Sequence, residues 1–148
     1  MTRSATPDIH HHLSSGAIQV RHALDQTYTM MCAAQVDPAL GDTAQIILGE
    51  VLNNVVEHAY NSVEGQPIEL SVWLRDDGLW CEVRDQGAPM PNGVPPAGVM
   101  PIVDADNPAD LPEGGFGWAL VRELTEHIQY DRQDGTNHLR FLIPTPKD

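Results

Sequence analysis

The chain has 148 residues, of which 41% are hydrophobic, a size and composition that suit one domain with a single core. Its formal net charge is −13, from 21 acidic and 8 basic residues, which disfavours direct nucleic-acid binding; the charge either favours a basic protein partner or only keeps a small protein soluble. No apolar run approaches the roughly 20 residues that a membrane span needs, and the polar N-terminus lacks the apolar core of a secretory signal, so we expect a cytoplasmic protein without a membrane anchor.

The first half of the chain is predicted to form a short strand and two helices. A segment with apolar ends at about residues 9–13 indicates the strand, and a serine at position 14 or 15 can cap a helix that ends near residue 34. Asp37-Pro38 then predicts the start of a second helix. Apolar residues recur in this helix at three- and four-residue steps as far as about residue 60, which is the strongest periodic signal in the chain.

The second half is predicted to form two hairpins, separated by a proline-rich segment and a helix. Apolar and polar residues alternate over 68–74 and 79–83, around an Asp-Asp-Gly turn, which is typical of a β-hairpin. Residues 86–114 contain 7 prolines and no lysine or arginine, a composition typical of a disordered loop or a functional lid. A helix that begins near residue 117 and two strands, over 128–132 and 138–143, complete the chain.

This order of elements predicts a single α+β domain over residues 1–148. We expect a two-layer α/β sandwich, in which the helices cover one face of a mixed, mostly antiparallel sheet. Trp73 and Trp80 should lie on the other face, where they could form a partner or dimer surface. The consecutive histidines His10 to His12 should alternate in direction along the first strand, so they do not form a ready metal cage.

Two polar residues lie four positions apart on the second predicted helix, whose face is otherwise apolar. Residues with this spacing share one face of a helix, so the carboxylate of Glu50 and the carboxamide of Asn54 project side by side. Such a pair suggests a site that handles a metal and a phosphate.

Two later segments could supply the remaining parts of such a site. Asp85 ends a predicted strand, where its carboxylate can accept a hydrogen bond from an exocyclic amino group, and Gly87 lets a flat ring approach. Glycines at 114, 115 and 117 precede a helix, whose N-terminal N–H groups can bind phosphate. Each segment by itself is also consistent with an ordinary turn, and the P-loop and dinucleotide-binding patterns are absent.

Together, the three segments resemble the N, G1 and G2 boxes of the GHKL ATPases. The matching patterns are Glu50-x-x-x-Asn54, Asp85-x-Gly87 and Gly115-x-Gly117, in that order. Within this superfamily, residues 54–60, 114–122 and 135–139 are most similar to the anti-sigma-factor serine-protein kinases of bacterial partner-switching systems. The resemblance covers about residues 9–144 and implies the histidine-kinase-like (Bergerat) ATPase fold.

The resemblance implies a role for each matching residue. Asn54 would coordinate Mg²⁺, which would bridge the phosphates of ATP, and Glu50 would act as the general base or orient the attacking hydroxyl. Asp85 would accept the adenine amino group, with Gly87 beneath the ring. The segment Gly115-Phe116-Gly117 would bring backbone N–H groups to the phosphates.

The resemblance also implies the partners. The protein would hold a sigma factor inactive, and it would bind a STAS-type anti-anti-sigma protein and phosphorylate it on a serine. Members of this branch are commonly dimers, so a homodimer is possible. The catalytic domain of a histidine kinase fits less well, because we expect no helix with a phospho-acceptor histidine before the domain.

Two departures from the family pattern bear on catalysis. Pro89 takes the place of the second G1 glycine, and Glu113 stands where related kinases carry an arginine that meets the terminal phosphate. A missing cationic stabiliser can cost several powers of ten in rate. ATP binding is therefore better supported than fast phosphotransfer, and the alternative is an ATP-binding sequestering protein with little or no kinase activity.

Overall fold

The computed structural model describes residues 6–96 and 115–146, so most of the proline-rich segment, with Glu113 and Gly114, lies outside the described residues. The elements along the chain are β1 (Ile9–Ser14), α1 (Ala17–Ala33), α2 (Pro38–Asn54), the π-helix η1 (Val55–Ala59), β2 (Pro67–Arg75), β3 (Gly78–Asp85), the 3₁₀-helix η2 (Pro91–Gly93), α3 (Gly115–Leu124), β4 (Glu126–Gln133) and β5 (Thr136–Pro144). In this part of the chain, no helix is both long enough and apolar enough to cross a membrane.

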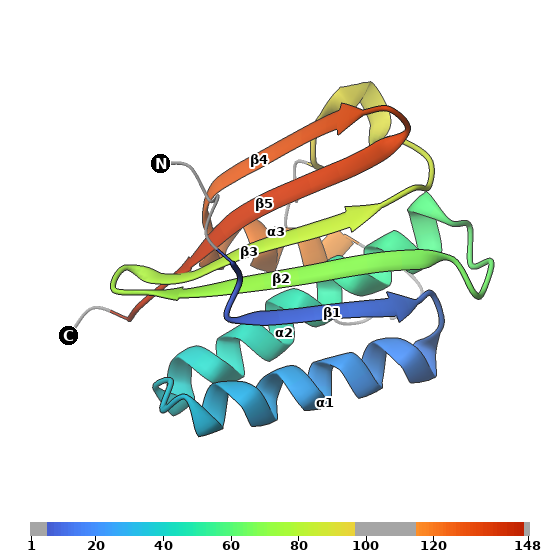
Figure 1. The fold of residues 1–148 in the computed structure, drawn as a ribbon. Helices are drawn as coiled ribbons and strands as arrows, with labels where there is room; N and C mark the ends of the chain where they lie inside the picture. The colour runs from blue at the N-terminus through green and yellow to red at the C-terminus, as the bar shows by residue number, and fades with distance from the viewer. Residues whose placement is uncertain (1–5, 97–114, 147–148) are drawn as a thin grey trace, which may run out of the picture.

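The strands form one sheet, and the helices α1, α2 and α3 pack against one of its faces (Figure 1). The order in the sheet is β1-β2-β3-β5-β4, and its neighbouring strands pair in antiparallel fashion. The main core lies between the two layers, where the largest fully buried side chains include Phe141, Met31 and Ile47. The predicted α+β sandwich is confirmed, and the sheet of the described residues is antiparallel throughout rather than mixed.

The two long helices begin in different ways. Gly16 precedes α1 without a side-chain cap, so the predicted serine cap is wrong. The Ser15 hydroxyl instead bonds to the backbone of the 63–66 loop, and it thereby ties the end of β1 to the start of β2. Helix α2 begins as predicted, with the Asp37 carboxylate accepting the N–H of Ala39 at 2.9 Å.

The second helix changes its form before it ends. From Val55 to Ala59 the chain is a π-helix, closed by a hydrogen bond from the N–H of Tyr60 to the carbonyl of Val55. Short π-helical turns are rare and frequently occur at functional sites. The carbonyl of Ala59 accepts the N–H of Ala88 at 2.8 Å, so this turn joins the helix end to the loop that follows β3.

The outer face of the sheet carries a second, smaller apolar cluster. Trp73, Trp80 and Leu142 are buried there, and the Trp80 ring stacks on His127 with 5.6 Å between the ring centroids. The two tryptophans lie on the predicted face. They do not, however, provide the exposed partner surface that the sequence suggested.

Candidate functional site

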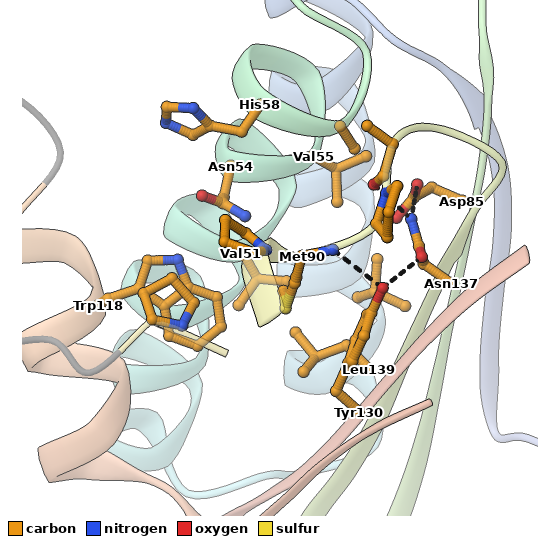
Figure 2. A pocket seen from close by; sticks show the side chains of 16 residues that line it. Val51, Asn54, Val55, His58, Asp85, Met90, Trp118, Tyr130, Asn137 and Leu139 are labelled. Carbon is orange, nitrogen blue, oxygen red and sulfur yellow. Dashed lines mark hydrogen bonds between the residues drawn. The ribbon is translucent and has the colours of Figure 1, made fainter. Parts of the chain in front are cut away.

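A cavity of about 500 Å³ lies between the sheet and the helices. Its walls come from the end of α2, η1, the loop after β3, the start of α3, and β4 and β5, as Figure 2 shows. Apolar side chains dominate, with a few polar groups that include Asn54, Asp85 and Asn137. This size and lining are typical of small-molecule sites.

The cavity brings together segments that lie far apart in the sequence. Asn54 from α2 and Asp85 from β3 both line it, and Trp118, one residue after Gly117, lines it from α3. The structure therefore places residues of the first two predicted boxes around one space, together with the residue that follows Gly117, whereas Gly117 itself is not among the lining residues.

Asp85 is held rigidly at the end of β3. Its side chain is 6% exposed, and its Oδ1 accepts hydrogen bonds from the N–H of Gly87 at 2.9 Å and from Nδ2 of Asn137 at 2.8 Å. Burial raises the pKa of the Asp85 carboxyl, against the opposing effect of these two hydrogen bonds and of the positive charge of Arg132. The hydrogen bonds recorded from described residues fall on Oδ1, so Oδ2 is the atom left to accept a hydrogen bond from a ligand.

Gly87 is needed for a contact that the sequence did not predict. A Cβ at this position would overlap the backbone carbonyl of Ala59, the last residue of η1. The carbonyl of Gly87 also accepts a hydrogen bond from Nη1 of Arg132 at 2.8 Å. Gly87 is not among the residues that line the cavity, and it permits the close packing of the loop after β3 on the end of the π-helix.

Glu50 lies beside the cavity, against the first turn of α3. A Cβ on Gly117 would overlap Oε2 of Glu50, so only a glycine leaves room for this carboxylate in its present place. Glu50 is exposed, and Asn54, one helical turn further along α2, is half-buried. The predicted Gly115-Phe116-Gly117 segment forms the first turn of α3.

Asn137 is a site residue that the sequence reasoning missed. It is 3% exposed, and its Nδ2 donates to Oδ1 of Asp85 and to the carbonyl of Ala88, while its Oδ1 accepts from the hydroxyl of Tyr130 at 2.5 Å and from Arg132 at 2.7 Å. The available signal was its place two residues after the glycine of the final turn, at the start of the last predicted strand. The register of β3 and β5 then sets it directly opposite Asp85.

Two aromatic side chains complete the walls. The Tyr130 hydroxyl accepts the N–H of Met90 at 3.0 Å, and Figure 2 shows the chain of hydrogen bonds that continues through Asn137 to Asp85. Trp118 is 5% exposed, and its buried Nε1 has no hydrogen-bond partner in the described structure. A buried donor without a partner is unfavourable by about 1–3 kcal/mol.

The polar groups fit a magnesium nucleotide. Oδ2 of Asp85 can accept a hydrogen bond from an amino group. The carboxamide oxygen of Asn54 is a hard ligand of the type that Mg²⁺ prefers.

Comparison with known families agrees with this fold and cavity. Residues 13–143 match the family described as histidine kinase-like ATPase domain. The chain belongs to this family, which confirms the resemblance to the GHKL ATPases.

Individual relatives include named kinases and anti-sigma factors. The chain is 32% identical over 91 residues to serine-protein kinase RsbW of Halalkalibacterium halodurans, covering 62% of this chain and 55% of that protein. It is 31% identical over 99 residues to serine/threonine-protein kinase BtrW of Bordetella bronchiseptica, covering 66% of each chain. It is also 22% identical over 128 residues to anti-sigma F factor of Bacillus subtilis, covering 81% of each.

The extent of these matches differs. The chain spans 55% of the first kinase and 66% of the second, so it matches between about half and two thirds of their length. Among solved structures, a histidine kinase domain from Erythrobacter litoralis aligns with a TM-score of 0.48 and 17% identity, covering 84% of this chain and 60% of that chain.

Proposed function

We propose that this protein is an ATP-dependent protein-serine kinase that also acts as an anti-sigma factor. It phosphorylates a STAS-type anti-anti-sigma protein on a serine, and it sequesters a sigma factor. The observation that carries the proposal is a cavity that Asn54, Asp85 and Trp118 line together, with the carboxylate of Glu50 beside it against Gly117. Family membership and the kinase and anti-sigma names of the relatives support it.

In this proposal, the cavity binds the adenine nucleotide. Oδ2 of Asp85 accepts a hydrogen bond from the adenine amino group, and Asn137 and Gly87 keep the carboxylate in place through Oδ1. Asn54 holds Mg²⁺, which offsets the negative charge of the phosphates. The backbone N–H groups at the start of α3, in the Gly115-Phe116-Gly117 segment, face the phosphates as an anion-binding helix N-terminus.

Glu50 is the residue that we assign to the phosphoryl acceptor. Its exposure allows a serine of a second protein to approach it, while Asn54 on the same face of α2 lies inside the cavity. The carboxylate accepts the proton of the serine hydroxyl, or orients that hydroxyl, while the serine oxygen bonds to the terminal phosphorus of ATP and ADP leaves.

Nucleotide binding is tested by thermal unfolding with and without Mg²⁺-ATP. At a ligand concentration about 100 times Kd, binding adds about 2.7 kcal/mol to the stability, which raises Tm by roughly 5–10 °C. Asn54→Ala and Asp85→Ala should abolish most of this increase, while Asn53→Ala, an exposed neighbour on α2, should retain it. An equal increase in all four proteins would contradict the assigned site.

Kinase activity is tested by transfer of radiolabelled phosphate from ATP to the cognate STAS protein. Label should appear on a serine with the wild type and disappear with Glu50→Gln, whereas Glu57→Gln, which changes an exposed carboxylate of η1, should remain active.

A second candidate function has support in the sequence. Residues 86–114 carry no lysine or arginine, and Glu113 stands at the position of the family arginine, which favours an ATP-binding sequestering protein with little or no kinase activity. In the two experiments, that protein would show the rise in Tm with Mg²⁺-ATP but no labelled serine.

A further inference from the structure

Two histidines and a glutamate converge on the outer face of the sheet. His10 and His12 lie two positions apart on β1 and therefore point to the same side, and Glu69 pairs with His12 across the β1–β2 ladder. The Nε2 atoms of the two histidines are 3.1 Å apart, and they lie 3.2 and 3.6 Å from Oε1 of Glu69. Because side chains alternate between the two faces of the sheet along β1, His11 points away from His10, whereas His10 and His12 lie on the same face.

The three distances match a tetrahedral metal site. Zinc bonds of about 2.0–2.1 Å to nitrogen and oxygen place neighbouring ligand atoms roughly 3.3–3.4 Å apart. The observed separations of 3.1, 3.2 and 3.6 Å lie on both sides of this value. One ion can therefore contact all three atoms after shifts of a few tenths of an ångström.

The imidazole ring of His10 is held in its orientation by a hydrogen bond to Ser71. Nδ1 of His10 is 2.9 Å from the hydroxyl oxygen of Ser71, which pairs with His10 across the ladder. A hydrogen bond at one ring nitrogen fixes the ring and directs the other nitrogen at the metal, as in most histidine-ligated sites. The His10 and His12 rings meet edge to face at an interplanar angle of 81°.

No cation of the described residues competes for Glu69. Arg84 lies opposite it in the β2–β3 register, but it pairs with Glu82 instead. The ion pairs recorded for Glu69 in the described part of the chain are those with the two histidines.

We propose that His10, His12 and Glu69 bind one divalent transition-metal ion of the zinc type, with a fourth position open to water. Two imidazole nitrogens and one carboxylate suit Zn²⁺, Co²⁺ or Ni²⁺, in contrast to the oxygen ligands that Mg²⁺ takes. The site lies on the outer face of the sheet, whereas the cavity lies on the helix side. A bound ion links the edge strand β1 to β2 through its ligands, so it stabilises the native sheet independently of the nucleotide.

The test is calorimetric titration of the metal-free, untagged chain with Zn²⁺. We expect one equivalent to bind and to raise Tm, and His12→Asn and Glu69→Gln to weaken binding at least about tenfold. Ser71→Ala should weaken it by about tenfold through loss of the orienting hydrogen bond. With Co²⁺ in place of Zn²⁺, the wild type should show the strong visible absorption of a tetrahedral ion.

The matched control is His22→Asn, which removes an exposed histidine near His11 on the other side of β1. This variant should bind Zn²⁺ as the wild type does. Absence of binding, binding unaffected by His12→Asn, or binding lost in His22→Asn would each overturn the proposal. Equal melting temperatures of the variants and the wild type in chelator verify that the substituted proteins remain folded.

Discussion

A substitution at Gly117 can change the geometry of the candidate active site without destabilising the fold. Its missing Cβ leaves the space that the carboxylate of Glu50 occupies, and Glu50 is an exposed, flexible side chain that can move aside. The glycine lies within α3, where alanine is the better helix former by about 1 kcal/mol. A side chain at this position should therefore disturb catalysis and leave folding intact.

We predict that Gly117→Ala keeps or raises the free energy of unfolding and lowers the proposed phosphotransfer by about 10- to 100-fold, because Glu50, the proposed base, is displaced by about an ångström. Denaturant unfolding and the labelled-phosphate assay measure the two effects. Gly49→Ala is the control: it lies within α2 and its Cβ meets only Leu24 at 3.7 Å, so it should raise the free energy of unfolding by up to about 1 kcal/mol and leave phosphotransfer unchanged. A fully active Gly117→Ala enzyme would exclude Glu50 in its present position as the base.

The buried, ionised carboxylate of Asp85 lowers the free energy of unfolding, and a ligand that donates a hydrogen bond to it can offset this effect. Burial raises the pKa of its carboxyl, so the ionised group destabilises the folded state at pH values above that raised pKa. As the pH falls through the raised pKa and below the unfolded value, this cost disappears. A neutral asparagine has no such cost at any pH.

We predict that Asp85→Asn raises the free energy of unfolding at neutral pH by about 0.5–2 kcal/mol and abolishes most of the nucleotide-dependent increase in Tm. The stability gain over the wild type should shrink as the pH is lowered, which denaturant unfolding at several pH values can follow. A gain that grows in acid would show that the carboxylate is stabilising in the folded state.

Among the secondary-structure elements, β5 holds the loop after β3 in place through one side chain. Asn137 connects Asp85, the carbonyl of Ala88 and the hydroxyl of Tyr130, so three segments depend on a single carboxamide. Arg132 of the adjacent strand β4 also donates a hydrogen bond to the carboxamide oxygen of Asn137. The loop therefore takes its shape from β4 and β5, and the π-helix η1 supports it from the other side.

We predict that Asn137→Ala lowers the free energy of unfolding by about 1–3 kcal/mol, because buried polar partners lose their hydrogen bonds. The affinity for the nucleotide should also fall, since Oδ1 of Asp85 loses the hydrogen bond that Asn137 donates to it. Asn53→Ala removes an exposed carboxamide from α2 and should change stability by no more than about 0.5 kcal/mol. Similar small effects of both substitutions would argue against a central role for the network.

For the whole molecule, the net charge of −13 acts on an approaching protein partner at longer range than any single contact does. Phosphorylation of a serine adds nearly two negative charges to the proposed STAS partner. Close approach to an acidic surface then becomes less favourable, which would release the partner after the reaction. The same repulsion is screened by salt.

We predict that phosphorylation weakens the affinity of the STAS partner by about tenfold or more at low ionic strength, and by less at high ionic strength. Calorimetry with the phosphorylated and unphosphorylated partner over a range of salt concentrations measures this difference. An affinity that is the same for both forms at every salt concentration would refute the electrostatic release.

The order of the elements and the family could be recognised from the amino-acid sequence without a structure. Helical periodicity, the Asp37 cap and strand alternation are local properties, so they can be recognised without a structure. Asn54 and Asp85 were predictable because their spacing follows a family pattern, and both line one cavity. The match of residues 13–143 to the histidine kinase-like ATPase domain confirms the family, while the roles of Asn54 and Asp85 stay predictions.

Contacts between residues that are distant in the sequence became known from the three-dimensional arrangement alone. The contact of Gly87 with Ala59, the network around Asn137 and the approach of Glu69 to His10 and His12 each join segments that a local pattern does not relate. The burial of the two outer tryptophans has the same origin. These features depend on strand register and on packing between layers, which arise from many long-range contacts acting together, and no short window of sequence contains them.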